Sequence, residues 1–197
     1  MRNGPVRLAG LVLAAVGALA GCGTTPASTA PAAPVAGAAA GDSTPAAATG
    51  SPSPAVAEVP SASARMICGP EAQEKIAQAL GLTLRRSATP LWTAPVYRCT
   101  YPFTAGPLVL SVREFADASA TTAYFTTARA AERSTELQGL GDAAFTTTDG
   151  SVYVRKDFKV LEVDVSRLPA AVGAASISRA DAAFVIAQLI MGCWTGQ

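Results

Sequence analysis

The sequence predicts an α+β domain, an antiparallel sheet of about five strands with helices packed on one face. Short stretches in which apolar and polar residues alternate are joined by turn residues, a pattern typical of hairpin-connected strands. Between them lie longer segments with apolar residues at helical spacing and capping residues at their ends. The expected order is α-ββ-α-βββ-α, and strands grouped in this way form antiparallel sheets. We expect this single domain to occupy residues 66–197.

Residues 1–21 are expected to be a cleavable signal peptide. Arg2 and Arg7 precede an apolar run, Leu8–Ala20, which is too short to cross the ~30 Å hydrocarbon core of a bilayer. The run ends in Leu19-Ala20-Gly21-Cys22, which resembles the lipobox of bacterial lipoproteins. The resemblance implies cleavage before Cys22 and acyl chains such as palmitate on that cysteine. The partner it implies is the cell membrane, with the protein lipid-anchored on its extracytoplasmic face.

Residues 22–65 are expected to be the lipidated cysteine and a disordered tether. Between Gly23 and Ala64 nearly every residue is Ala, Pro, Ser, Thr or Gly, and none is aromatic, Leu or Ile. This composition cannot bury enough apolar surface to offset the backbone entropy lost on folding. The Ser, Thr and Pro content would suit O-glycosylation, but a plain spacer is the simpler interpretation.

The first helix is predicted to begin at Pro70 and to end before Gly81. Proline suits the first helical position, and glycine supplies the left-handed conformation of a helix C-cap. Residues 83–95 are predicted to be mostly loop because Pro90 and Pro95 break regular structure.

Two strands and a second helix are predicted next. The strands cover residues 96–102 and 108–115, and apolar and polar residues alternate clearly in the second of them. The helix is expected over residues 117–133 and should pack through Tyr124, Ala128 and Ala131.

A second sheet segment is predicted at residues 143–165, where Asp149-Gly150 is a strong signal for a two-residue hairpin. Ser178 and Asp181 then form a capping box that starts the last helix. That helix is apolar nearly all round and too short to span a membrane, so we expect it to be buried against the sheet.

Three cysteines follow Cys22, namely Cys68, Cys99 and Cys193. An oxidising exterior favours disulfides, although an odd number leaves one thiol over or pairs it between chains. A disulfide between Cys68 and Cys99 is preferred because it would link the first predicted helix to the first predicted strand. The alternative is a bridge between Cys68 and Cys193.

Composition excludes several classes of function. The formal net charge is +1 and there is no basic tract, so the sequence lacks the clustered positive charge expected of a nucleic-acid-binding surface. The absence of histidine excludes Ser-His-Asp and Cys-His catalytic sets and histidine metal sites. No CxxC spacing and no glycine-rich phosphate loop is found, so no metal and no cofactor is expected.

The candidate binding residues are Trp92, Arg85 and Arg86, in the predicted loop. Loops held by a rigid sheet often carry recognition residues, and an exposed tryptophan offers a large contact area. The two arginines could bind an anion. Core packing of Trp92 and a solvated loop around the arginines are the simpler alternatives.

Glu162 and Asp164 project from one face of a predicted strand and could perform acid–base chemistry on glycans. Because they alternate with Leu161 and Val163, a solvated strand face is the simpler interpretation. The basic residues at the preceding hairpin end could touch anionic lipid, but a charged, solvated turn explains them equally: they are Arg155, Lys156 and Lys159.

Several segments together resemble an uncharacterised family of actinobacterial lipoproteins with a lipobox, an Ala/Pro/Ser-rich tether and one small cysteine-containing extracellular domain. They are Met66-Ile67-Cys68-Gly69, Tyr97-Arg98-Cys99-Thr100-Tyr101, Leu108-Val109-Leu110-Ser111-Val112 and Gly192-Cys193-Trp194. Separately, Gly139-Leu140-Gly141-Asp142-Ala143-Ala144 and Val160-Leu161-Glu162-Val163 are similar to a pattern in extracellular domains of bacterial surface proteins, including sensor domains of some actinobacterial serine/threonine kinases. Neither resemblance implies a catalytic site.

The expected function is therefore that of a non-catalytic binding, sensing or accessory module on the cell surface. Its partner would be an envelope ligand or a membrane protein whose identity the sequence leaves open. The alternative is a cell-envelope hydrolase that uses the carboxylates of Glu162 and Asp164.

Overall fold

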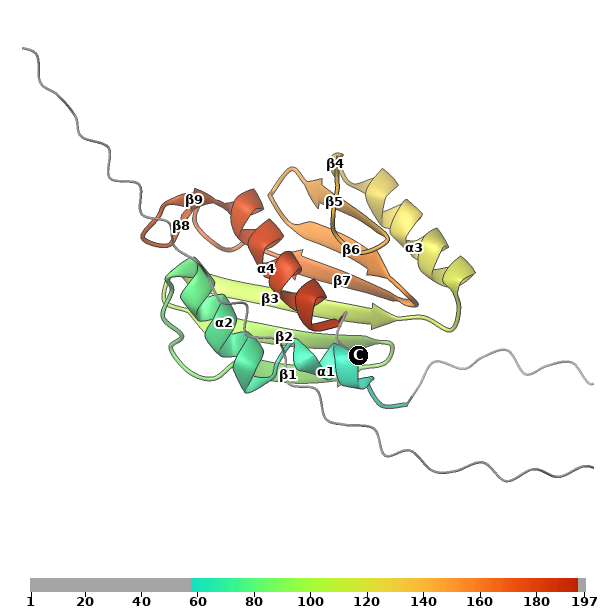
Figure 1. Cartoon of the computed structure of the whole chain (residues 1–197), viewed down its shortest axis with the longest axis horizontal. Coiled ribbons are helices and arrows are strands. Elements are labelled where there is room, and N and C mark those ends of the chain that lie inside the picture. Colours follow the sequence, from blue (N-terminus) through green and yellow to red (C-terminus); the bar gives the residue numbers. More distant parts are fainter. Residues whose placement is uncertain (1–57, 195–197) are drawn as a thin grey trace, which may run out of the picture. The chain divides into compact units, whose positions relative to one another are not determined.

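The computed structural model describes residues 58–194, which form a seven-stranded antiparallel sheet, a small two-stranded sheet and four helices (Figure 1). The helices are α1 (Ala62–Met66), α2 (Pro70–Leu80), α3 (Ala118–Ala131) and α4 (Arg179–Trp194). The strands of the large sheet are β1 (Thr89–Thr93), β2 (Val96–Phe103), β3 (Gly106–Glu114), β4 (Ser134–Leu137), β5 (Ala143–Thr147), β6 (Val152–Lys156) and β7 (Lys159–Asp164). The small sheet is β8 (Ala171–Val172) with β9 (Ile177–Ser178). The predicted α+β class is confirmed.

The large sheet is made of two antiparallel meanders joined at its centre. Its strand order is β1-β2-β3-β7-β6-β5-β4, so β3 pairs with β7 although α3 and three strands separate them in sequence. The predicted count of about five strands is therefore wrong. The predicted chain order is also wrong, because it lacks α1, β1, β4, β8 and β9. β1 forms where a loop was expected over residues 83–95, because Pro90 lies on an edge strand, where a missing N–H is tolerated.

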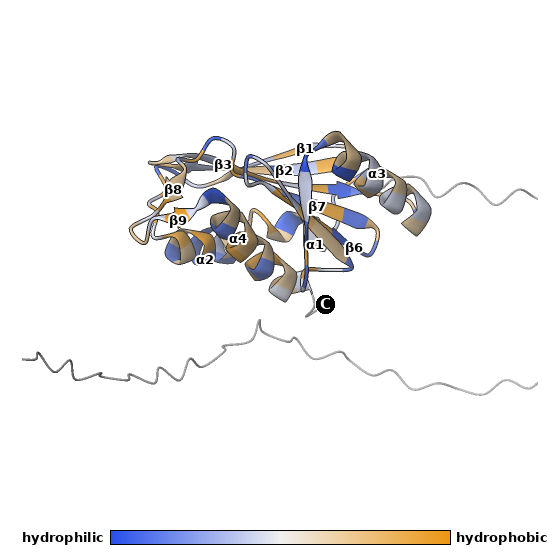
Figure 2. Cartoon of the chain, turned by 90° about the horizontal axis from the view of Figure 1, so that it is seen from above, coloured by the Kyte–Doolittle hydropathy of each residue, from blue (hydrophilic) through white to orange (hydrophobic). Residues whose placement is uncertain are grey.

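Helices lie on both faces of the sheet, and the prediction of one helical face is wrong. Figure 2 shows α2 and α4 together on one side of the strands, with α3 on the other. The main core lies between the sheet and α1, α2 and α4, and it contains inward residues of every strand from β2 to β7 except β4. A separate small cluster of Phe125, Phe145 and Val160 lies under α3.

Local sequence signals place the helix ends where they were expected. Pro70 starts α2, and Gly81 caps its end in the left-handed conformation, with φ of 59°. The hydroxyl of Ser178 accepts a hydrogen bond from the backbone N–H of Asp181 over 3.1 Å at the start of α4. Helix α3 is capped by Asp117, and its buried residues are Thr121 and Phe125. Tyr124 and Ala128 pack against the same cluster as predicted, but Ala131 is exposed, so the prediction for Ala131 is wrong.

The ordered structure begins before Met66, the predicted domain boundary. Helix α1 lies within residues predicted as tether, and Ala64 is completely buried in the main core. The backbone N–H of Ser61 donates to the Glu114 carboxylate over 3.2 Å. The indole N–H of Trp194, near the end of α4, donates to the carbonyl of Ser63 over 3.0 Å. These contacts make the segment just before Met66 part of the domain.

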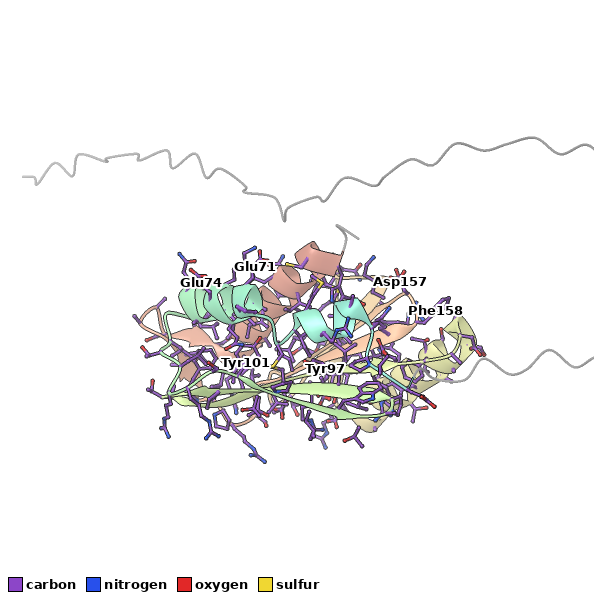
Figure 3. The ribbon with its side chains drawn as sticks, turned by 90° about the horizontal axis from the view of Figure 1, so that it is seen from below. Glu71, Glu74, Tyr97, Tyr101, Asp157 and Phe158 are labelled. Atoms are coloured by element: carbon purple, nitrogen blue, oxygen red, sulfur yellow. A yellow bond between two sulfur atoms is a disulfide. The ribbon has the colours of Figure 1, made fainter. Side chains whose placement is uncertain are left out.

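The predicted disulfide between Cys68 and Cys99 is confirmed, and it ties the start of α2 to β2. The Tyr101 hydroxyl strengthens the same junction by donating to the carbonyl of Ile67. Figure 3 shows Tyr97 and Tyr101 between the sheet and the helices that cover it. Burial raises the pKa of Tyr101 above its ordinary value, so its hydroxyl keeps the proton it donates. Cys193 is half-buried near the end of α4.

Candidate functional site

The candidate site is a cleft on the face of the sheet that α1, α2 and α4 leave open. Its volume is about 400 Å³. Strands β1, β2, β3, β6 and β7 supply its floor and walls, together with Pro95 in the turn between β1 and β2 and Tyr124 from α3. Because α3 covers only the β5–β7 half of this face, the helix forms one side of the cleft and does not fill it.

Four polar side chains form a row across the floor. The strand register pairs Arg98 with Ser111, Ser111 with Glu162, and Glu162 with Tyr153. Residues paired in this way on antiparallel strands present their side chains on the same face of the sheet. Their neighbours along each strand point into the main core, so the row follows directly from strand alternation.

Two guanidinium groups give the cleft its positive end. Arg98 is exposed on β2, and Arg113 lies on β3 with its guanidinium carbon 4.8 Å from the centre of the Tyr124 ring. Within residues 58–194 neither arginine forms an ion pair with a carboxylate. Both cations therefore remain available to an anion, and the aromatic ring holds Arg113 in place.

Tyr153 and Glu162 form a polar pair at the middle of the row. The Tyr153 hydroxyl donates to Oε1 of Glu162 over 2.7 Å, and its ring stacks on Phe145 at 4.8 Å. Burial, and after it the negative charge of Glu162, raise the pKa of Tyr153 well above its ordinary value. Tyr153 therefore stays protonated and acts as a fixed donor to Glu162.

Ser111 is the most buried polar residue of the cleft, with an exposed fraction of 4%. Its hydroxyl forms no hydrogen bond with any residue in the described part of the chain. In the described part of the chain no fully buried side-chain oxygen or nitrogen lacks a hydrogen-bond partner, so the Ser111 oxygen is accessible from the open cleft. Water or a ligand in the cleft can bond to it.

The remaining lining is largely apolar. Leu91 on β1 is 58% exposed at the mouth of the cleft, and Val96 and Val160 contribute aliphatic surface. Such a mixture of apolar walls with a few polar groups is typical of small-molecule sites. The arrangement suits recognition of an organic anion whose charged group meets the arginines while its apolar part contacts the aliphatic wall.

The three residues proposed from the sequence lie outside this cleft. Trp92 is half-buried against the main core, and its indole N–H donates to the carbonyl of Glu58 over 2.9 Å. Arg85 and Arg86 are exposed, and the guanidinium of Arg85 donates to the carbonyl of Thr104 over 3.1 Å, beyond the far end of β2. The structure therefore brings Arg85 close to neither Arg98 nor Arg113.

Arg98, Arg113 and Leu91 were missed as site residues. Strand alternation could have put Arg98 and Arg113 on the face opposite the core, since each follows or precedes a buried apolar residue. The sequence does not indicate that β3 pairs with β7, and this pairing is what brings Glu162 next to Ser111. Glu162 and Asp164 do share the open face, as predicted, and both are half-buried.

Cys22 lies outside the described residues, as do the predicted signal peptide and most of the predicted tether. Among the helices within residues 58–194, none has the length and apolar character needed to cross a membrane. Neither a family model nor a curated protein nor a solved structure matches this chain.

Proposed function

We propose that the chain is a lipid-anchored, extracytoplasmic binding module whose open sheet face takes a small organic anion. The observation that supports this most is the pair of guanidinium groups, on Arg98 and Arg113, that lack a carboxylate partner in the described part of the chain. They stand beside the Ser111 side chain in a partly apolar cleft. Charge-assisted hydrogen bonds to a carboxylate or phosphate are the strongest contacts this set can make.

The test uses benzoate and benzamide, which share a ring and differ in charge. Calorimetric titration of the purified chain should show benzoate binding and benzamide binding much more weakly. Arg98→Ala should weaken benzoate binding by at least about tenfold, because a charged hydrogen bond contributes about 1.5–3 kcal/mol. Arg98 is exposed, so this substitution should leave the melting temperature nearly unchanged.

Arg86→Ala is the matched control, since it removes a positive charge that is also exposed but lies outside the cleft. It should leave benzoate affinity unchanged. Weaker binding in Arg86→Ala with unchanged binding in Arg98→Ala would move the site to the surface around Arg85 and Arg86. Hydrolysis of an envelope glycan by the purified chain, abolished by Glu162→Gln, would contradict the non-catalytic function.

The proposed location rests on Cys22. Cys22→Ala should move the protein from the membrane fraction into the medium, or leave it as uncut precursor, because the acyl chains supply the anchor. Cell fractionation followed by mass measurement of the mature protein checks this. A variant that stays in the membrane fraction with the normal mature mass would contradict lipidation at this residue.

A further inference from the structure

Glu162 places one negative charge inside the cleft that Arg98 and Arg113 make positive. Among the described residues that line the cleft, these three are the charged ones. Glu162 is half-buried on β7, opposite Ser111 of β3 in the strand register. In the described part of the chain it forms an ion pair with neither arginine. The two arginines explain how the cleft binds an anion, but they do not explain a carboxylate beside that anion.

Tyr153 holds this carboxylate in place as a hydrogen-bond acceptor. The tyrosine ring stacks on the completely buried Phe145, and its hydroxyl donates to Oε1 of Glu162 over 2.7 Å. A carboxylate has about four positions at which it can accept a hydrogen bond. Among the described residues Tyr153 is the one donor to Glu162. The side chain can therefore accept a further hydrogen bond from a molecule in the cleft.

The charges around Glu162 favour a neutral donor over a cation. Two guanidinium groups and one carboxylate give the cleft a net positive charge, so a positive group on the ligand would be repelled. A hydroxyl group adds no charge, and its hydrogen bond to a carboxylate is strengthened by the charge of the acceptor. Such a bond would also offset the repulsion between Glu162 and the anionic group of the ligand.

The strand register brings the arginines and the carboxylate within reach of one small molecule. Arg98 and Glu162 stand two strands apart, which separates their Cα atoms by about 10 Å. Arg113 stands diagonally across the β3–β7 pair from Glu162, at about 7–8 Å. Both arginine side chains are long, so a ligand built on a single aromatic ring can contact a guanidinium group and the Glu162 carboxylate together.

We propose that the cleft binds an anion that also carries a neutral hydrogen-bond donor, such as a hydroxylated aromatic acid, and that Glu162 selects for this donor. The anionic group contacts Arg98 and Arg113, while the hydroxyl donates to the Glu162 carboxylate. The ring lies against the aliphatic wall. This inference rests on the proposed function and adds a second recognition group to the ligand.

The test compares benzoate with meta- and para-hydroxybenzoate and with the two matching methoxybenzoates. Calorimetric titrations of the purified chain are made at neutral pH, where a phenol keeps its proton. At least one hydroxybenzoate should bind about tenfold more tightly than benzoate, because it adds a hydrogen bond to a charged acceptor. Its methoxy counterpart should show no such gain, since a methoxy oxygen can accept a hydrogen bond but cannot donate one.

Glu162→Gln should change two affinities in opposite directions. Glutamine keeps the size of the side chain and removes its charge. The preference for the hydroxybenzoate over benzoate should fall several-fold, because the acceptor is now neutral. Benzoate itself should bind more tightly, since the repulsion between two carboxylates is gone. A cleft that was merely damaged would lose affinity for both compounds. An unchanged preference in Glu162→Gln would overturn the inference.

Asp164→Asn is the matched control, because Asp164 lies two residues from Glu162 on the same face of β7 but does not line the cleft. Its Oδ1 accepts from the backbone N–H of Ser166 over 2.9 Å, and asparagine can accept this bond as well. The preference for the hydroxybenzoate should stay unchanged in this variant.

Two outcomes separate this inference from the proposed function. If hydroxybenzoates and methoxybenzoates bind equally well, selection by Glu162 is wrong, while the anion site stands as long as Arg98→Ala weakens benzoate binding. If neither benzoate nor any of its derivatives binds, the anion site and the inference that rests on it are both overturned.

Discussion

Replacing both Cys68 and Cys99 by serine is expected to lower the free energy of unfolding by about 3.5 kcal/mol. The two cysteines are 31 residues apart, and the bridge removes the entropy of that loop from the unfolded chain. For a domain of this size the loss corresponds to a decrease in melting temperature of roughly 10–15 °C. Thermal unfolding with and without a reducing agent measures it, and reduction should destabilise the wild type but not the double variant.

The bridge acts at a junction that also depends on side-chain hydrogen bonds. Gln73 donates to the carbonyl of Cys68 over 2.9 Å and accepts from the backbone N–H of Ala88 over 2.9 Å. Together with the Tyr101 hydroxyl on Ile67, these bonds position α2 against the sheet. We therefore expect the reduced domain to remain folded at low temperature, with the junction near Cys68 opening first.

Cys193→Ser is the matched control, since it removes a half-buried thiol that lies outside the disulfide. It should cost much less than the double variant, because it removes no covalent link between distant parts of the chain. Peptide mapping without reduction should recover the Cys68 peptide joined to the Cys99 peptide. A Cys193 variant as unstable as the double variant, or a Cys68–Cys193 peptide, would contradict the pairing.

Gly173→Ala is expected to destabilise the domain by about 3 kcal/mol or more. Gly173 follows β8 in the left-handed conformation, with φ of 67°, and its Cα packs against the end of α2. A Cβ atom there would overlap the carbonyl oxygen of Leu80, a backbone atom that cannot rotate away. The substitution combines an unfavourable φ with a steric clash, and chemical denaturation measures the total loss.

Gly139→Ala separates these two causes. Gly139 also has a positive φ, of 79°, but an added Cβ would meet no atom within 4 Å. Its substitution should therefore cost only the backbone penalty, about 1 kcal/mol. Equal losses in the two variants would show that the contact with Leu80 contributes nothing.

Local sequence signals predicted most of the elements of this fold. Pro70 and Gly81 bound α2, and Ser178 and Asp181 start α4, because each signal acts over a few residues. Asp149-Gly150 does lie in the connection between β5 and β6, but this connection is longer than the predicted two-residue hairpin, since the last strand pair is Thr146 with Val152. Alternation likewise predicted which face of β3 and β7 is buried. The residues of a segment determine which of its faces is buried and how its helix ends are capped. Both features can therefore be predicted without knowing which segments lie beside it.

The rest depends on contacts that are distant in sequence. Helical spacing predicted which side of α3 is apolar, but not which face of the sheet it would cover. Strand β1 was not predicted because Pro90 favours a loop unless the segment is known to be an edge strand of a sheet. The row of Arg98, Ser111 and Glu162 forms because β3 pairs with β7. No pattern within a single segment of the sequence predicts this pairing. The candidate site was therefore missed, although Glu162 was correctly assigned to the face opposite the core.

The location of the anion on the open face is the central claim, and an NMR titration of the isotope-labelled chain with benzoate tests it most directly. We predict that the backbone amide signals of Arg98, Ser111 and Glu162 shift in a saturable manner. Signals from α2, such as that of Glu74 on the opposite side of the sheet, should remain in place. Shifts confined to Arg85, Arg86 and Trp92, or to the helical face, would contradict the account.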